Sequence, residues 1–354
     1  MGIVKKDIIS NKYINDGYSK VSLNSVQNKY KESFINDSRI QYNIIDKCHL
    51  CGSKDFTVIA EKGRHGIPLD TAVCYVCGLV FTVNQMTEKS IEIFYSEYYR
   101  KIYDVDVKKD WKNIDNRYSA NGRISKFVKQ SDVVVEIGAG GGWNLFRYKT
   151  AGIEHYGFDF DDEYIDYGKK KYGISLYRGG IDKAKELGIK ADYVILSHIV
   201  EHLNNPVDYL MDLKKILKPL ARVVITVPCL NYMLTRGARY DFLGYLQNAH
   251  SYSFDEYTLR YLGMKANYKI VCGLGGYIMI QNTNKKNDLF CKFEKKQKIR
   301  GPKIIRYLKI CEQLLGIKTV LIPKKIEFIF EYLDFLLKPF KLIRAIMVTR
   351  LGIK

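Results

Sequence analysis

Short apolar runs, each followed by a polar turn and an amphipathic segment, recur through the middle of the chain. The clearest begins at Val133–Val135, a β-branched run typical of a strand buried on both faces. Glu136 and a glycine-rich turn follow it. A helix is predicted next over 143–150, and then a second strand over 155–158 that ends at Asp159. This order predicts a βαβ unit with a ligand loop at the carboxyl end of its first strand.

Strand-like and helix-like segments continue to alternate beyond this unit, which favours a largely parallel sheet with helices on its faces. Apolar residues at helical spacing also predict helices over 88–103 and 113–129, ahead of the unit. The segments predicted after Asp159 are, in order, a helix over 162–172, strands over 175–177 and 191–196, a helix over 208–217, a strand over 222–227, a helix from near Ser253 with Glu256 at capping-box spacing, and strands over 268–271 and 277–281.

The residues in and around the glycine-rich turn after Glu136 indicate which kind of nucleotide the turn would hold. A dinucleotide fingerprint needs a glycine three positions beyond Gly140, where this chain has Trp143. The acid before the turn suits a cationic ligand, and S-adenosylmethionine carries a sulfonium, an ammonium and no phosphate. Asp159 lies 21 residues after Gly138, where an acid accepts hydrogen bonds from ribose hydroxyls. These residues favour S-adenosylmethionine, and the alternative is a turn without a ligand.

Two CxxCG pairs precede the βαβ unit. Cys48 and Cys51 are followed, after 22 residues, by Cys74 and Cys77. A glycine after each pair lets the backbone curl around the sulfur ligands. The spacing predicts a zinc ribbon in which four thiolates hold one zinc ion tetrahedrally. Because no fifth ligand or open position is evident, the zinc is predicted to be structural; the alternatives are two disulfides or a redox pair.

The chain resembles the class I S-adenosylmethionine-dependent methyltransferases. The motifs that carry the resemblance are VVVEIGAGGG, YGFDFD, ADYVILSHIVEHLNNP and LKKILKPLARVVITVP, over about residues 120–280. One departure is Leu220-Ala221, where the family usually has two glycines before its fifth strand. The resemblance implies an α/β fold with a Rossmann-like, doubly wound sheet of seven strands, to which the zinc ribbon and a helical basic C-terminal tail are added.

The resemblance also implies which residues contact the cofactor. In the family, the loop after the third strand lies against the adenine, and this loop holds Gly180, Ile181 and Asp182; a surface turn is the alternative. The carboxyl end of the fourth strand faces the methyl group. The expected cofactor site is therefore Glu136, Gly138, Gly140, Asp159, Phe160, Gly180, Ile181, Ser197 and His198.

The segment 247–254 adds a second resemblance. Together with the ribbon and the tyrosine-rich helix before the unit, it resembles the sugar C-methyltransferases that act on deoxysugar nucleotides; related polysaccharide-cluster methyltransferases share the looser pattern. In the sugar C-methyltransferases a Tyr-x-Glu-His run carries the catalytic base. His250 matches that histidine, whereas Gln247 and Ala249 replace the tyrosine and the glutamate. His202 matches the other active-site histidine.

The resemblance thus implies His250 as the base, with His202 behind it. Tyr98 or Tyr252 is expected to orient His250 in place of the missing pair, although the aromatic stripe that includes Tyr98 is also typical of plain packing. His198 and His202 are four residues apart, so they are expected to share a helical face. Such a pair could indicate a metal, but the sequence shows no third ligand. For His202, capping or packing is the alternative.

The net charge of +19 lies mostly in the tail, since residues 281–354 contain 18 Lys and Arg against 6 Asp and Glu. Residues 326–348 place apolar side chains among lysines, a pattern that favours basic helices lying on an anionic membrane surface. A helical hairpin that packs on the body or on a second subunit is the alternative. No apolar run has signal-peptide or membrane-spanning length. The expected location is the cytoplasm, at the inner face of the membrane if the tail binds lipid.

The sequence therefore predicts an S-adenosylmethionine-dependent methyltransferase for a sugar or sugar-linked acceptor of surface polysaccharide biosynthesis. Its partner would be a sugar nucleotide or a lipid-linked sugar. An RNA methyltransferase whose ribbon and tail hold phosphates is the alternative, although the ribbon is not strongly basic. A third is a non-catalytic module that binds the cofactor or a partner. The predicted domains are an extension (1–47), the ribbon (48–83), a helical linker (84–120), the methyltransferase domain (121–285) and the basic extension (286–354).

Overall fold

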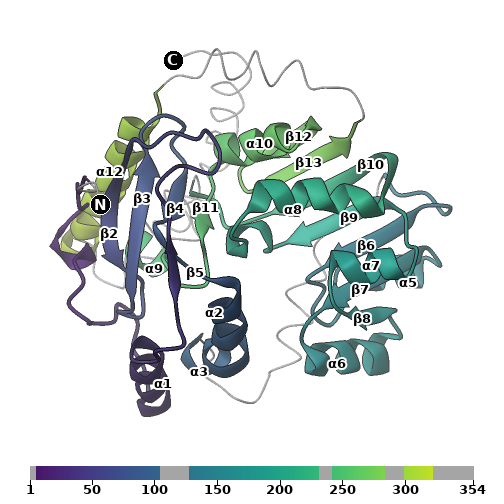
Figure 1. Ribbon diagram of the computed structural model, residues 1–354, viewed down its shortest axis with the longest axis horizontal. Coiled ribbons are helices and arrows are strands. Elements are labelled where there is room, and N and C mark those ends of the chain that lie inside the picture. The colour runs from purple at the N-terminus through teal and green to yellow at the C-terminus, as the bar shows by residue number, and fades with distance from the viewer. Residues whose placement is uncertain (1–4, 104–126, 231–240, 284–298, 322–354) are drawn as a thin grey trace.

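The computed structural model of the protein describes residues 5–103, 127–230, 241–283 and 299–321. Two β-sheets with a shared core form its frame (Figure 1). The larger sheet has seven strands, and the smaller has four. The large sheet carries the candidate cofactor loop. In the sequence, the strands of the small sheet begin between the two cysteine pairs and continue after the second pair.

The seven-stranded sheet runs in the order β12-β13-β10-β9-β6-β7-β8. The five strands from β10 to β8 are parallel, whereas β13 is antiparallel to both β10 and β12. The carboxyl ends of the parallel strands therefore meet at one edge, and the strand order reverses between β6 and β9, where α/β sheets bind ligands. The strands are β6 (Val133–Ile137), β7 (Glu154–Asp159), β8 (Leu176–Arg178), β9 (Ala191–Ser197), β10 (Leu217–Thr226), β12 (Tyr268–Leu274) and β13 (Tyr277–Asn282).

Helices cover both faces of this sheet, which confirms the predicted doubly wound α/β fold. Alternate residues of β6 face opposite ways: Val133 and Val135 join the core under α7, α8 and α10, whereas Val134 joins the core under α5 and α6. The helices are α5 (Phe146–Thr150), α6 (Asp162–Tyr172), α7 (Ile181–Glu186), α8 (Pro206–Leu213) and α10 (Glu256–Lys265), with 3-10 turns at Val200–His202 and Lys214–Ile216.

Several predicted boundaries are wrong, among them the start of the strand expected over 222–227, which begins at Leu217. The helix expected over 143–150 begins only at Phe146, because the glycine loop continues as turns before it. The helix expected over 208–217 ends at Leu213, and Leu217 already pairs with Ala191 in the sheet. The helix expected from near Ser253 is capped by Asp255, whose Oδ1 accepts the N–H of Thr258 at 2.8 Å.

Leu220 shows how the chain manages without the family's glycines before the fifth strand. Its φ is +63°, a left-handed conformation that favours glycine, and its side chain is 67% exposed. The register between β9 and β10 shifts in this region, between Leu217 and Arg222. Leu220 therefore lies at an irregularity within β10 with its side chain in solvent, and the regular pairing of β10 with β9 continues from Arg222.

The smaller sheet runs β11-β4-β3-β2 and is antiparallel. Its strands are largely buried, because one face shares the core of the large sheet and the other packs against α9 (Phe242–Tyr245) and α12 (Gly301–Leu321). The sheet that carries Cys74 is therefore built into the body of the protein. The strands are β2 (Phe56–Lys62), β3 (Pro68–Cys74), β4 (Val80–Thr82) and β11 (Tyr252–Ser253).

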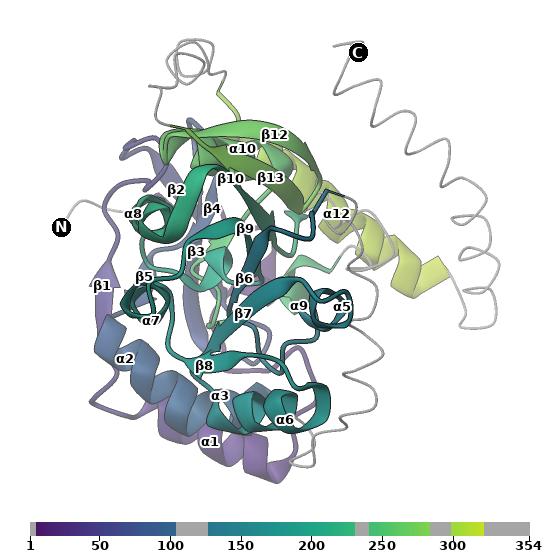
Figure 2. The same cartoon turned by 90° about the vertical axis from the view of Figure 1, so that its right-hand side faces the viewer.

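Of the remaining elements, helices α1, α2 and α3 lie together at one end of the molecule (Figure 2), whereas Tyr13 packs in the core next to α9 and α12. The helix predicted over 88–103 is continuous, and its middle turn is a π-helix. It packs against α1, and its stripe of Phe94, Tyr98 and Ile102 is buried, as the packing interpretation expects. The remaining elements are a 3-10 turn at Asn11–Tyr13, α1 (Ser25–Ile35), β1 (Tyr42–Ile44) paired with β5 (Asn84–Met86), α2 (Glu88–Ile93), the π turn Phe94–Tyr98 and α3 (Tyr99–Tyr103).

Two predictions lie outside the described residues: nearly all of the helix over 113–129, and the basic tail over 326–348. The described start of the tail, α12, packs on the body through Ile304, Leu308 and Cys311. Among the described helices, none is long and apolar enough to cross a bilayer.

Helix α6 lies directly on the glycine loop. A Cβ added to Gly168 would lie 2.3 Å from the carbonyl oxygen of Gly141 and 2.5 Å from Leu176 Cδ1. Since the first contact is to backbone, it cannot be relieved by rotating a side chain. The glycine in this helix therefore sets how closely the helix approaches the loop.

Replacing Gly168 by alanine should destabilise the protein by about 1–2 kcal/mol. Helix propensity alone would favour alanine by about 1 kcal/mol, so the clash with Gly141 decides the sign. Thermal or urea unfolding measures it, with the exposed α6 variant Lys170→Ala as the control, expected within about 0.5 kcal/mol of wild type. A Gly168→Ala protein as stable as wild type would show that the helix can move away from the loop at no cost.

Candidate cofactor and active site

The loop from Gly138 to Gly142 follows β6 at the switch point of the sheet. Gly138 and Gly140 have φ of +72° and +54°. An added Cβ would lie 2.1 Å from Ile199 Cδ1 at Gly138 and 2.6 Å from the Trp143 ring at Gly140. Trp143, which stands where a dinucleotide fingerprint has glycine, thus lies against the loop.

Glu136 is buried at the base of the loop, with 1% of its surface exposed. Asn144 Nδ2 donates a hydrogen bond to its Oε1 at 2.6 Å, and among the described residues Oε2 has no partner. Burial raises the pKa of Glu136 to about 8, the hydrogen bond from Asn144 opposes this rise, and the charge of Asp159 adds to it. An unpartnered acid of this kind fits a ligand that brings positive charge or a hydrogen-bond donor.

Asp159 ends β7 and holds the loop from the side. Its Oδ2 accepts the N–H of Gly140 at 2.7 Å, and its Oδ1 accepts the N–H of Asp161 at 2.9 Å. Burial raises the pKa of the Asp159 carboxyl. An ionised carboxylate has about four acceptor sites, so ribose hydroxyls could still donate to Asp159.

The other expected cofactor residues border the same edge of the sheet. The Phe160 ring is 70% exposed, and a Cβ on Gly180 would lie 3.8 Å from its Cζ. Ile181 is buried as the first residue of α7. The loops after β7 and β8 therefore meet around an exposed aromatic ring, an arrangement that suits a flat base. Arg178 strengthens the junction, because its Nη1 donates to the Phe160 carbonyl at 2.7 Å.

The fourth strand, β9, ends at Ser197. Thr226 Oγ1 donates to Ser197 Oγ at 3.0 Å, and the His198 N–H donates to the Thr226 carbonyl at 2.9 Å. His198 has a φ of +57° and lies outside any helix, so the predicted helical face shared with His202 is wrong. The chain turns sharply at His198, and the 3-10 turn starts only at Val200.

The structure brings His202 and His250 together from segments almost fifty residues apart. Their ring centroids lie 4.6 Å apart, with the rings nearly perpendicular. His202 Nδ1 lies 2.9 Å from the carbonyl oxygen of Ala249 and 2.9 Å from the hydroxyl of Tyr95. Gln247 Nε2 contacts the His250 ring, 2.5 Å from its Nε2.

Both imidazoles are held neutral by their surroundings. Burial lowers the pKa of His202, and it lowers the pKa of His250 well below the ordinary value of 6.5. The charges of His202 and His198 lower the pKa of His250 further. A neutral imidazole can accept a proton or ligate a metal, whereas a protonated one can do neither.

The expected orienting tyrosines do not contact His250. Tyr98 donates its hydroxyl to Asp37 Oδ2 at 2.7 Å, and Tyr252 donates to the Asn204 carbonyl at 2.7 Å. Gln247, which occupies the place of the family's tyrosine, contacts the ring instead. Tyr95 is the linker-helix tyrosine that reaches a catalytic candidate.

Sequence reasoning missed Asn144, Tyr95 and Glu201 as site residues. Glu201 lies between His198 and His202: its Oε1 is 3.2 Å from His198 Nδ1 and 4.0 Å from His202 Nε2. The position of Glu201 within the SHIVEHLNNP motif could have indicated a site residue. Its burial could not be predicted, because that burial depends on the distant segment around Ser251. There the Ser251 N–H donates to the Glu201 carbonyl at 2.8 Å.

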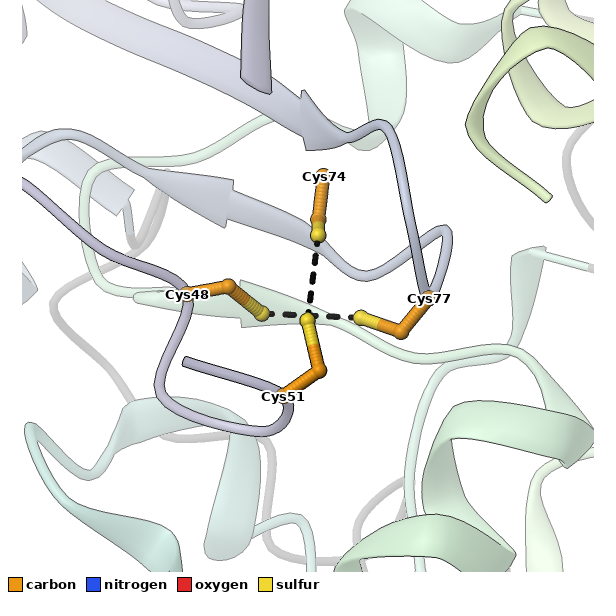
Figure 3. Close-up of side chains that lie close together, drawn as sticks. All are labelled: Cys48, Cys51, Cys74 and Cys77. Atoms are coloured by element: carbon orange, nitrogen blue, oxygen red, sulfur yellow. Dashed lines mark hydrogen bonds between the residues drawn. The ribbon is translucent and has the colours of Figure 1, made fainter. Parts of the chain in front are cut away.

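The four predicted zinc ligands converge (Figure 3). Cys48 Sγ lies 3.5 Å from Cys77 Sγ, and Cys51 Sγ lies 3.4 Å from Cys74 Sγ. A tetrahedral zinc with Zn–S bonds of about 2.3 Å separates its sulfurs by about 3.8 Å, so the cluster fits the ion with a slight expansion. Gly52 and Gly78 have φ of +73° and +76°, as expected of knuckle glycines. His49 contacts Tyr252 and is not part of the cluster.

A zinc ion held by Cys48, Cys51, Cys74 and Cys77 would join the loop before β2 to the end of β3. Its chemistry there would be structural, since all four positions are filled by thiolates. The second knuckle also anchors α12, because the Gly301 N–H donates to the Tyr75 carbonyl at 2.9 Å and the Arg300 N–H donates to the Val76 carbonyl at 3.1 Å.

Residues 111–272 match the profile of a family described as a methyltransferase domain, and that segment contains the loop, both acids and most of the sheet. This segment is a methyltransferase domain, and the enzyme is accordingly an S-adenosylmethionine-dependent methyltransferase. The family match begins after the cysteine cluster, so the cluster lies outside the matched segment. A comparison with curated proteins finds no match.

Solved structures of methyltransferases are similar to this one over about half of the chain. A SAM-dependent methyltransferase of Archaeoglobus fulgidus has 20% identity and a TM-score of 0.37, covering 60% of this chain and 89% of its own. The magnesium protoporphyrin IX methyltransferase of Synechocystis, with bound SAH, has 15% identity and a TM-score of 0.38, covering 54% and 97%. A SAM-dependent methyltransferase of Methanosarcina mazei has 13% identity and a TM-score of 0.37, covering 46% and 97%.

Asp159→Ala in this methyltransferase should weaken S-adenosylmethionine binding at least tenfold, because a charged acceptor for two hydroxyls contributes about 1.5–3 kcal/mol. Calorimetry should show wild-type binding of micromolar order. A cofactor that lacks the 2′-hydroxyl tests whether Asp159 contacts the ribose directly or only supports the loop. Wild type should bind this 2′-deoxy cofactor more weakly than the natural one, whereas Asp159→Ala should bind both with equal affinity. The exposed α6 variant Asp166→Ala is the control. Equal affinity of Asp159→Ala and wild type for the natural cofactor would remove the ribose assignment.

Elemental analysis of the purified methyltransferase should find about one zinc per chain. Cys51→Ser should lose the zinc and lower the soluble yield and the melting temperature, because metal binding at such a site supplies folding free energy. Cys272→Ser is the matched control, since Cys272 is exposed on β12 and should keep the metal. A stable, zinc-free wild-type protein would contradict the assignment.

Proposed function

We propose that the enzyme transfers the methyl group of S-adenosylmethionine to a sugar or sugar-linked acceptor in surface polysaccharide biosynthesis. The observation that carries the proposal is the approach of His250 to His202 beside the end of β9. The resemblance to sugar C-methyltransferases implies that both histidines belong to the active site, and they lie far apart in the sequence. Their pairing in space supports a common role in activating the acceptor.

In this reaction the acceptor atom forms a bond to the methyl carbon while the carbon–sulfur bond breaks and its electrons remain on sulfur. The acceptor also loses a proton. Placing the two reactants close together supplies much of the rate, and a group that assists the loss of the proton supplies more. His250 is the group best placed for this assistance, with His202 beside it.

A small cavity lies next to the histidines. Its volume is ≈ 20 Å³, and its lining includes Tyr95, His202, Asn248 and His250. This is room for about one water molecule, so the reacting group of the acceptor fits here rather than a whole sugar ring. Gln85, which also lines the cavity, has a buried Nε2 with no partner among the described residues, so it could donate to an acceptor hydroxyl.

A basic groove elsewhere on the protein does not favour the RNA alternative. Its volume is ≈ 770 Å³, and Lys6 and Lys309 line it. Lys6 pairs with Glu61 at 2.7 Å, and Lys309 pairs with Asp7 at 2.7 Å. Two of the four cations that line the groove are thus neutralised by carboxylates of the same chain, which leaves Lys5 and Arg306 and reduces the charge available to a phosphate backbone.

Contact of the tail with an anionic membrane at the cytoplasmic face remains part of the proposal. It rests on the basic sequence after residue 321, since the described helix α12 packs on the body. Such contact would bring the enzyme to lipid-linked sugars.

His250→Gln should lower turnover by about 10²-fold or more while leaving S-adenosylmethionine affinity within about twofold. Candidate acceptors are sugar nucleotides and lipid-linked sugars, tested by transfer of a labelled methyl group. His202→Gln should also slow turnover. The control is His155→Gln, at the opposite end of the sheet in β7, which should keep wild-type turnover. If His250→Gln turns over at the wild-type rate, proximity alone drives transfer and the role of His250 is lost.

A further inference from the structure

Three side chains beside the cavity have the composition and spacing of a metal centre. Glu201, His202 and His250 each offer one ligand atom, and these atoms all lie within 4.8 Å of one another. We propose that Glu201, His202 and His250 bind one divalent transition-metal ion. The site is separate from the cysteine cluster, and it rests on the proposed function only for what the ion does to the acceptor.

The hydrogen bonds of His202 prepare its other nitrogen for a metal. The Ala249 carbonyl, 2.9 Å from Nδ1, can only accept, so Nδ1 carries the hydrogen and Nε2 keeps its lone pair. That Nε2 is the atom 4.0 Å from the Glu201 carboxylate. A metal-ligating histidine commonly donates its second N–H to a backbone carbonyl, which fixes both tautomer and ring orientation.

Glu201 supplies the independent reason for a cation here. It is 1% exposed, and its Oε2 has no hydrogen-bond partner among the described residues. Within the described part of the chain, the ion-pair partners of its Oε1 are the imidazoles of His198 and His202, and no lysine or arginine forms an ion pair with it. Burying a carboxylate without a compensating charge is costly, and a divalent ion held with the two imidazoles would compensate it.

The ligand set selects the kind of ion. Two imidazoles and one carboxylate suit manganese, iron, cobalt or zinc, whereas calcium and magnesium require mostly oxygen ligands. Three protein ligands leave coordination positions open. The cavity beside His202 and His250, with its volume of ≈ 20 Å³, can hold the oxygen that fills one of them.

An ion at this site would deepen the proposed function. A hydroxyl bound to a divalent cation has a strongly lowered pKa, so the acceptor could release its proton to water. The oxygen lone pair would then form the bond to the methyl carbon as the carbon–sulfur electrons pass to sulfur. His250 would act as a ligand of the ion, and the loss of turnover expected for His250→Gln would follow from loss of the metal.

Manganese is the suitable probe, because it binds thiolates weakly and should leave zinc on the four cysteines. The zinc-containing enzyme is titrated with Mn²⁺, and free Mn²⁺ is followed by its electron paramagnetic resonance signal. Wild type should bind about one Mn²⁺ per chain. Glu201→Gln and His250→Gln should each weaken binding at least tenfold, whereas His155→Gln should bind as wild type does. Zinc content and melting temperature verify that each variant is folded.

Absence of Mn²⁺ binding by wild type, or unchanged binding by folded Glu201→Gln and His250→Gln, would overturn the metal site. If a ligand variant fails to fold, Co²⁺ spectroscopy of wild type decides: d–d bands without thiolate charge transfer support these ligands, and thiolate charge transfer alone refutes them. The titration needs no acceptor. Metal binding without transfer to any sugar would therefore contradict the acceptor assignment and leave the metal site standing.

Discussion

The candidate active site depends on backbone hydrogen bonds that hold residues 250–253 between the two sheets. Tyr252 and Ser253 pair with β4 of the ribbon. The Thr82 N–H donates to the Ser251 carbonyl at 2.9 Å, and the Ser251 N–H donates to the Glu201 carbonyl at 2.8 Å. Residues 251–253 thus connect β4 to the turn after β9. His250 approaches His202 because the adjacent Ser251 is hydrogen-bonded both to Thr82 and to Glu201.

This connection gives the cysteine cluster a role in the geometry of the site. Cys74 ends β3, β3 pairs with β4, and β4 pairs with β11. On one face, the small sheet shares a hydrophobic core with the large sheet. On its other face, it shares a second core with α9 and α12. A zinc ion on the four thiolates would therefore stabilise the sheet edge on which the histidine segment is held, although it takes no part in the chemistry.

The sequence was informative where structure follows from local pattern. The βαβ unit, the bounds of α6 and the closing strands β12 and β13 were predictable, because apolar runs, glycines and capping acids act within a few residues. The glycine loop with Glu136 and Asp159 was predictable for the same reason. The pairing of β11 with β4 was not, since it joins residues about 170 positions apart and only two residues form the strand.

The same limit applied to individual side chains of the site. Tyr95, Asn144 and Glu201 became site residues only through contacts that the fold creates. His198 was expected on a helix because its spacing from His202 is helical, but a residue with positive φ at the strand end broke that continuity. The resemblance pointed to His202 and His250, but it could not indicate what surrounds them in the fold.

The π turn at Phe94–Tyr98 has a consequence for how one helix serves two surfaces. In a regular α-helix each residue turns by about 100°, so positions four apart drift by about 40° around the axis. A wider turn holds about one more residue, which offsets that drift and keeps Phe94, Tyr98 and Ile102 on one buried line. Tyr95, next to this line, is then directed to His202. The helix can therefore pack in the core along one face and still direct Tyr95 to His202, because the π turn contains about one residue more than a regular turn.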